Sequence, residues 1–378
     1  MKTYKLLCLL LMCIIVTSCK KSDDGGDGGP TINPGADVEY TLLVNAANGL
    51  DAIALNADAE VITLGGVDSD FSEATAPSLS FKNGSVYSFY TQTGNCSATF
   101  LKFDFDTETA ATNELFSDLG ACNITAQAVA HSNDMGYVAY GVEENTSTFN
   151  YFIRAIDMAG EANDFTDIPL TKKPVHLGFT NNRLFVLTID DEVSDENFLT
   201  VIDSQTNGVL TEINLGYDAQ KLLRNRNGNI IISYDELHTH LNSETFTTEF
   251  IQYQSGKEPQ FASSKVNNFD DQGKMYYEKP SGQFSEYPLI PAVFDFEQNL
   301  TTLYPYENFL TETQRNFEYK IETTTMVGYD EKNEYVLIGY KKTGTGEKGG
   351  LLRLSTGAMP TVIDNIDVNG IPFNIIVK

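Results

Sequence analysis

Two histidines that stand two residues apart, His238 and His240, are the best candidates for metal chemistry in this chain. Residues i and i+2 of a β-strand point to the same side of the strand, so both imidazoles can reach one metal ion. Asp235 lies just upstream and can supply a third ligand. The other interpretation is an exposed polar loop or strand end that holds no metal, and the pattern leaves both open.

Carboxylates are densest at Asp190, Asp191 and Glu192. Ca²⁺ prefers carboxylate oxygens, so calcium or another divalent cation is the one cofactor to consider, and we otherwise expect none. The spacing does not match an Asp-x-Asp-x-Asp-Gly loop, and a run of charges is usually just solvated. Together with Glu143 and Asp235, this cluster is predicted to follow the innermost strand of three consecutive repeats. These loops would then line one face, where a cation or a basic partner could dock.

The sequence contains no clear catalytic motif. Residues 344–349 read G-T-G-E-K-G and match G-x-G-x-x-G, but the strand-like LLRLS follows where a dinucleotide site needs a helix, so we predict a hairpin loop. G-x-S-x-G and H-E-x-x-H are absent, and the absence of Trp removes the Trp-Asp repeat family. His131 and His176 are isolated and are predicted to be structural or exposed. These observations favour a binding protein over an enzyme.

The first 18 residues are predicted to be a signal peptide. Lys2 and Lys5 form a positive start, and an apolar run of 11 residues follows at 6–16. Such a run fits a secretory signal and is too short for a membrane-spanning helix, which needs about 20 residues.

The signal ends in Val16-Thr17-Ser18-Cys19, which resembles the bacterial lipoprotein box. The resemblance implies that Cys19 becomes the first mature residue and carries the acyl chains, palmitate among them. Residues 19–37 are rich in Gly, Asp and Pro and are predicted to be a flexible tether. Residues 22–24, Ser-Asp-Asp, resemble the acidic export tag of surface lipoproteins in the Bacteroidetes, although two lysines intervene. We expect the outer membrane, facing the exterior; the alternative faces the periplasm.

Composition narrows the possible partners. The net charge of −27 disfavours nucleic acid and anionic lipid surfaces, so the lipid anchor is the expected contact with the membrane.

Of the five cysteines, Cys96 and Cys122 remain after the signal and Cys19 are set aside. An exported pair with no other partner predicts a disulfide, and two free thiols are the alternative.

The elements that must position these residues follow from a repeat. Seven times, an apolar strand leads through a polar turn into another strand, at spacings of 43 to 58 residues. A period of about 40–50 residues with several strands per unit is typical of a β-propeller. We therefore predict an all-β fold of seven blades, each of about four antiparallel strands, over residues 38–378. The turns are centred near Asn56, Asp106, Asp157, Asp203, Gln254, Glu297 and Ser355.

Each unit also has an apolar strand upstream of its turn, such as RLFVLTI at 183–189, which is predicted to be the innermost strand of its blade. One unit, at 184–216, resembles the YVTN-type propeller repeat through its LTVID strand and its Thr-Asn turn. The resemblance implies the fold and carries no catalytic residues. With its lipoprotein box and its repeats, the chain resembles the propeller lipoproteins of the Bacteroidetes.

The sequence thus predicts a lipid-anchored protein of the cell envelope, and a monomer. Its propeller face would hold a protein, a glycan or a small ligand, and a place beside an outer-membrane uptake system fits such a role. One alternative is a propeller hydrolase or lyase that acts on extracellular polymer. A second is a structural or adhesive surface protein.

Overall fold

A computed structural model describes residues 37–47, 49–68, 71, 77–94, 96–120, 123–145, 148–159, 164–344, 346–356 and 359–378. The predicted signal peptide, Cys19 and the tether up to residue 36 lie outside the described residues, as does Cys122. The described residues belong to one compact unit at 35–378.

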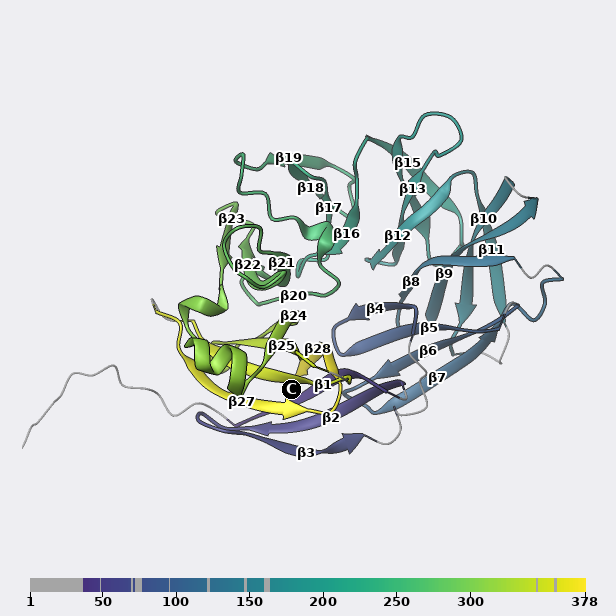
Figure 1. Ribbon diagram of the computed structural model, residues 1–378. Helices are drawn as coiled ribbons and strands as arrows, with labels where there is room; N and C mark the ends of the chain where they lie inside the picture. Colours follow the sequence, from purple (N-terminus) through teal and green to yellow (C-terminus); the bar gives the residue numbers. More distant parts are fainter. Residues whose placement is uncertain are drawn as a thin grey trace, which may run out of the picture. The chain divides into compact units, whose positions relative to one another are not determined.

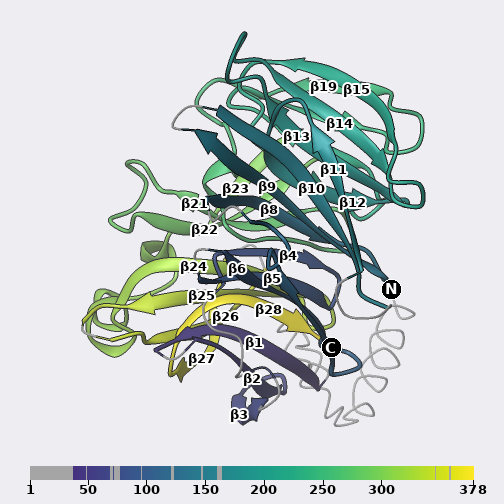
Figure 2. The same ribbon diagram turned by 90° about the vertical axis from the view of Figure 1, so that its right-hand side faces the viewer.

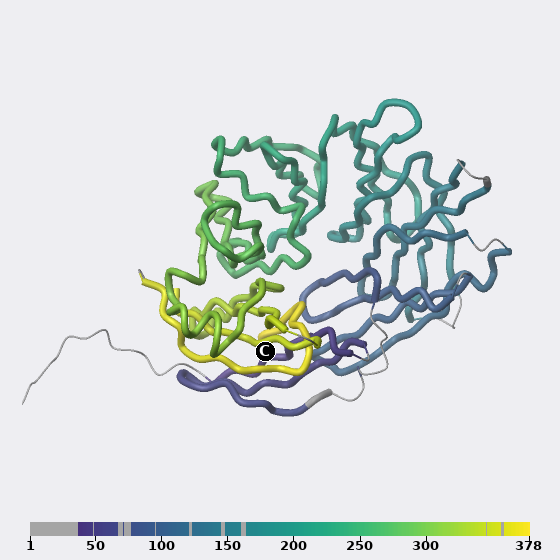
Figure 3. Tube along the Cα trace, in the orientation of Figure 1, coloured from purple at the N-terminus to yellow at the C-terminus, as the bar shows by residue number. Residues whose placement is uncertain are grey.

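Seven four-stranded antiparallel sheets follow one another around a common centre, which confirms the predicted seven-bladed β-propeller (Figures 1 and 2). Six sheets are built from four strands that are consecutive in sequence. The seventh has the order β28-β1-β2-β3, so the last strand of the chain pairs with the first (Figure 3). This pairing of the two chain ends closes the ring. We number the blades from this one, as blades 1 to 7.

The innermost strands line the centre, and several of them contact the inner strand of the next blade. They are β28 (Ile371–Val377), β4 (Leu79–Asn83), β8 (Ile124–His131), β12 (Lys173–Thr180), β16 (Lys221–Arg224), β20 (Asn267–Phe269) and β24 (Ile321–Asp330). The second strands are β1 (Val38–Ala46), β5 (Val86–Gly94), β9 (Met135–Asn145), β13 (Arg183–Ile189), β17 (Ile230–Ser233), β21 (Met275–Pro280) and β25 (Tyr335–Lys342).

The third strands are β2 (Gly49–Ala57), β6 (Ser97–Asp104), β10 (Thr148–Asp157), β14 (Asn197–Asp203), β18 (Leu237–Leu241), β22 (Leu289–Asp295) and β26 (Gly349–Ser355). The outer strands are β3 (Ile62–Asp68), β7 (Thr109–Leu115), β11 (Phe165–Leu170), β15 (Val209–Gly216), β19 (Thr248–Gln252), β23 (Leu300–Leu303) and β27 (Val362–Val368). Short helical turns are η2 (Phe261–Ser263), η3 (Tyr306–Asn308) and the π-helical η4 (Gln314–Glu318). None of the described helices is long and apolar enough to cross a membrane.

The strands predicted to be innermost are in fact the second strands of their blades. Arg183–Ile189, for example, pairs with β12 on one side and β14 on the other. A second strand is covered by strands at both edges and by neighbouring blades at both faces, so it is the most continuously apolar segment of its unit. The true inner strands carry polar residues such as Lys82 and Asn268, which weakens their apolar pattern.

The predicted turns between third and outer strands are confirmed in six blades and wrong in blade 5. There the turn runs from Asn242 to Thr247, whereas Gln254 follows the outer strand β19. Asn242 accepts hydrogen bonds from the backbone N–H groups of Glu244 and Thr245, as Asp203 does from two N–H groups in blade 4.

The core consists of apolar clusters between adjacent blades, and a few buried charges are fully paired within them. The Arg154 guanidinium is buried and lies 2.7 Å from carboxylate oxygens of both Asp118 and Asp167. It also stacks over the Phe165 ring at 3.9 Å. This arrangement ties β10, β11 and the connection after β7 together.

Candidate functional site

The two predicted ligand histidines do face the same side of β18. Their Nε2 atoms lie 3.0 Å apart, so one imidazole donates a hydrogen bond to the other. The side chain of His238 is completely buried, with the rings of Tyr253 and Phe296 within 5.3 Å of its own. Burial, and second the neighbouring His240, lowers the pKa of His238 to about 3. The pair lies in the apolar contact between blades 5 and 6.

The other predicted ligands do not join this pair. The Asp235 carboxylate accepts a 2.6 Å hydrogen bond from the Gln220 amide in an exposed turn. In the acidic cluster, Asp191 pairs with Lys173 at 3.3 Å, and Glu192 is exposed. Within the described ranges, no group of three or more His, Cys, Asp or Glu side chains could hold a metal ion.

The acidic turns occupy a different place in the blades from the predicted one. The turns that contain Asp190 and Asp235 follow the second strands β13 and β17, and Glu143 lies near the end of β9. Because second-to-third turns of all blades open on one face, these three carboxylates belong to the same face. They lie above the middle of their blades and not at the rim of the central channel. Docking of a partner there stays a prediction.

The cysteine predictions stay untested because Cys19 and Cys122 lie outside the described residues. Cys96 is in the β5–β6 hairpin, between the second and third strands of blade 2. Residue 122 falls in the connection from β7 to β8, which opens on the same face as that hairpin. The topology is therefore compatible with the predicted disulfide. The sequence spacing predicts other loops, with Cys96 between the first and second strands of its unit and Cys122 near the loop between the third and fourth.

The central channel is the more promising site. A cavity of about 730 Å³ is lined by residues from six of the seven inner strands: β4, β12, β16, β20, β24 and β28. Ligand pockets are commonly 300–1,000 Å³, so this volume suits a small molecule. Seven Lys or Arg and four Asp or Glu line the cavity. The whole chain has 25 against 52, so the charge balance is reversed inside the channel.

Lys82 crosses this channel. It comes from β4 in blade 2, and its ammonium donates hydrogen bonds to Asn268 Oδ1 of blade 6 and to Asn374 Oδ1 of blade 1, the latter at 3.4 Å. The carbonyl oxygen of Ile375 accepts a third, at 3.3 Å. All three acceptors are neutral. Burial lowers the pKa of Lys82 to about 8, so the side chain stays mostly protonated at neutral pH.

Asn268 is itself held in place. Its amide nitrogen donates to the carbonyl oxygen of Val327 on β24, at 2.8 Å, which directs the amide oxygen to Lys82. A second link across the channel joins Arg224 of blade 5 to the Asn83 side chain of blade 2. Side chains from opposite blades thus meet in the channel, and they position its polar groups against one another.

A second partly buried lysine, Lys221, differs from Lys82 because it has an acidic neighbour. Its ammonium donates to the Ser264 carbonyl oxygen at 2.6 Å. Burial lowers the pKa of Lys221 to about 8, and the nearby Glu278 carboxylate opposes the shift. Burial, and second the charge of Lys221, lowers the pKa of His176 to about 3, so this channel histidine is neutral.

Some buried polar atoms of cavity-lining residues have no hydrogen-bond partner within the described structure: the Tyr87 hydroxyl, Asn267 Oδ1 and His176 Nδ1. Buried polar groups in folded proteins are nearly always hydrogen-bonded, so such atoms call for a ligand or water. Tyr87 also lies under the Lys82 ammonium, 5.6 Å from ring centroid to Nζ.

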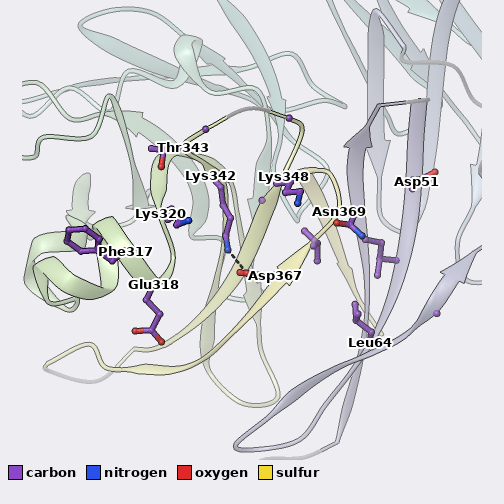
Figure 4. A pocket seen from close by; sticks show the side chains of 16 residues that line it. Asp51, Leu64, Phe317, Glu318, Lys320, Lys342, Thr343, Lys348, Asp367 and Asn369 are labelled. Atoms are coloured by element: carbon purple, nitrogen blue, oxygen red, sulfur yellow. Dashed lines mark ion pairs between the residues drawn. The ribbon is translucent and has the colours of Figure 1, made fainter.

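Another cleft, of about 780 Å³, lies between blades 7 and 1 (Figure 4). The glycine-rich stretch 344–349 contributes to its wall and connects β25 to β26, which confirms the predicted hairpin. Lys342 of this cleft is paired with Asp367. Phe317 is 73% exposed at its edge. It is the weaker candidate because its lining comes from only two blades, whereas six inner strands contribute to the channel.

The channel residues are not among the sites predicted from the sequence. Short polar segments such as Lys82-Asn83-Gly84 precede the strands predicted to be innermost, and their composition suits a tight connection between blades. A usable signal was present: each of these segments lies directly before an apolar second strand, so the residues just upstream must belong to the inner strand.

Comparisons with known proteins support the fold. No family model matches the chain, and no curated protein is similar to it in sequence. The periplasmic gluconolactonase PpgL of Pseudomonas aeruginosa is similar in structure, with a TM-score of 0.53 and 9% identity over 90% of this chain and 99% of that one. Apo AztD of Citrobacter koseri has a TM-score of 0.47 and 9% identity over 90% and 98% of the two chains. At this identity, what the chain shares with PpgL is the seven-bladed β-propeller fold alone.

Proposed function

We propose that this protein is a non-enzymatic, lipid-anchored binding protein of the cell envelope that holds a small polar ligand in its central channel. One observation carries the proposal: a cavity of ligand size is lined by ordered polar side chains that reach across the ring from opposite blades. Polar groups that converge in a concave site are typical of ligand binding. The lipoprotein box at Cys19 and the tether to residue 37 support the anchoring.

Binding is preferred to catalysis because the candidate site for a hydrolase is poorly accessible. Asp235, His238 and His240 are the only candidate residues for that activity, and His238 is completely buried between two blades. An extracellular polymer cannot reach such an imidazole without separating the blades. The channel offers hydrogen-bond donors and positive charge, which suit recognition.

The binding site is tested by obstructing the channel. Ser80 is exposed on β4, lines the cavity and lies on the same side of the strand as Lys82. Ser80→Trp is expected to obstruct the part of the channel beside Lys82, and Thr248→Trp, on the exposed outer strand β19, is the matched control. Thermal-shift screening of small polar solutes should find compounds that stabilise the wild type and the control but not Ser80→Trp. Compounds that stabilise all three proteins equally would place the site elsewhere.

The anchor is tested separately. Cys19→Ala is expected to move the protein from the membrane fraction to the soluble fraction and to abolish labelling by radioactive palmitate. Retention of the variant in membranes would contradict lipid anchoring. Protease accessibility on intact cells then distinguishes display on the exterior from a position facing the periplasm.

A further inference from the structure

We infer that the channel ligand is an anion, and that Lys82 binds its carboxylate or phosphate group. This inference rests on the proposed function, because it specifies the ligand class of the same site. Nothing in the overall composition suggests it, since the chain as a whole is strongly acidic. It comes from where the few basic residues are.

The first argument is charge placement. A protein with 25 basic and 52 acidic residues has more basic than acidic side chains around its channel, and of these basic residues Arg226 is paired with Asp271. Placing like charges together in a confined, partly desolvated space is unfavourable unless something compensates them. An anionic ligand supplies that compensation, whereas a cation would be repelled.

The second argument is the set of hydrogen bonds that the Lys82 ammonium makes. Two of its three hydrogen bonds, at 3.3 and 3.4 Å, are longer than ordinary ones. Its acceptors are neutral, and among the residues that the structure describes no acidic side chain compensates it as Glu278 does Lys221. A carboxylate or phosphate oxygen can replace the two long contacts with charge-assisted hydrogen bonds, which are roughly twice as strong as neutral ones.

The third argument is the set of polar atoms around Lys82. The Tyr87 hydroxyl is buried without a partner and can donate to an oxyanion. Asn268 and Asn374 fix the lysine from two other blades. A site assembled from blades 1, 2 and 6 holds its donors rigidly, so an anion that enters meets groups that are already in position.

The acidic exterior does not prevent entry. Surface charges are screened over about 8 Å at physiological ionic strength, so those on the exterior act only weakly on an anion inside the channel. The exterior instead disfavours anion binding anywhere else on the molecule. Anion binding should therefore be confined to one site per chain.

The experiment measures binding to the mature full-length protein by isothermal titration calorimetry. The probes are gluconate, inorganic phosphate and glucose, which has the carbon skeleton of gluconate without its charge. We expect gluconate or phosphate to bind at one site per chain and glucose not to bind. Binding of phosphate alone would identify phosphate groups as the recognised chemistry, and binding of gluconate alone would identify carboxylates.

Variants assign the site. Lys82→Met is expected to weaken anion binding at least tenfold, and Lys257→Met, an exposed lysine outside the channel, should leave it unchanged. If Lys82→Met fails to fold, as judged by circular dichroism and gel filtration, Lys265→Gln provides the second test. Lys265 is exposed at the cavity, so its loss should be tolerated and should weaken binding about threefold.

The possible failures are distinguishable. Equal binding of glucose and gluconate, with no effect of Lys82→Met, would overturn the anion inference and leave the channel as a ligand site. Absence of binding by both anions would overturn it as well. Anion binding that persists in Ser80→Trp would overturn the proposed function itself, because the anion would then bind outside the channel.

Discussion

Acidification should destabilise this protein through its buried histidines, and His131 allows the effect to be measured cleanly. His131 ends β8, is 2% exposed, and contacts the Ser88 hydroxyl through Nδ1 at 3.0 Å. Burial, and second the charge of Lys102, lowers its pKa from 6.5 to about 3. The folded protein therefore keeps this imidazole neutral under conditions in which the unfolded chain protonates it.

The sign and size follow from proton linkage. Between pH 6.5 and about 3 the unfolded state binds one more proton at this position, so stability is full above pH 6.5 and falls as the pH drops. The loss is about 1.4 kcal/mol per pH unit for one group. From pH 7.5 to pH 5, His131 should therefore cost the wild type about 2 kcal/mol of unfolding free energy.

The assay is urea unfolding of the wild type and His131→Gln at both pH values. Glutamine keeps a hydrogen-bonding group near Ser88 and does not titrate. Groups that titrate alike in both proteins cancel in the comparison. The free energy of unfolding should fall by about 2 kcal/mol less in the variant than in the wild type. Equal losses within about 0.5 kcal/mol would show that folded His131 accepts a proton near its ordinary pKa, which would refute the burial argument.

Three further predictions concern the scaffold. Arg154→Met should cost about 3 kcal/mol in urea unfolding because it leaves two carboxylates without their partner. Lys172→Met, which removes a more exposed ion pair, should cost less than about 1 kcal/mol, and similar losses in the two variants would contradict this. Gly349→Ala should lower stability by about 2 kcal/mol, since its Cβ would lie 2.6 Å from a backbone oxygen of β25; an unchanged unfolding midpoint would argue against so tight a contact. A disulfide between Cys96 and Cys122 should appear as one linked peptide in non-reducing mass spectrometry, and its removal should cost about 3 kcal/mol; two alkylated thiols in the native protein would exclude it.

Much of the fold could be predicted because turn chemistry repeats along the chain. Asp104, Asp203 and Asp295 each accept hydrogen bonds from the backbone N–H groups two and three residues later, and each ends a third strand. The aspartate that closes each turn is within three residues of its hydrogen-bond donors, so this turn pattern can be recognised from the sequence alone. In blade 5 the same role falls to Asn242, and the outer strand that follows is mostly exposed. Because β19 lacks an apolar pattern, the strand-turn-strand motif is weak in this unit. The turn was therefore predicted near Gln254, downstream of its true position.

The site could be predicted less well because its contacts join distant segments. The two-residue period of a strand correctly predicted that the side chains of His238 and His240 lie on the same side. The period could not show that Phe294 and Phe296 of the next blade enclose them. This burial depends on how adjacent blades pack in the ring. As a result, the two histidines lie in the apolar core.

The error about the inner strands and the location of the channel site have the same physical origin. A strand that faces a solvent-filled channel has no blade against one of its edges, so it does not need an uninterrupted apolar sequence. Polar residues such as Lys82 and Lys221 are therefore tolerated on β4 and β16, where on a second strand they would be buried without compensation. Tolerance alone does not explain why these residues are basic in so acidic a chain. Local departures from a folding pattern are expected where function requires them, and the positive charge in the channel is such a departure. If Lys82→Met bound anions less tightly and was also more stable than the wild type, this charge would be retained for binding at a cost in stability.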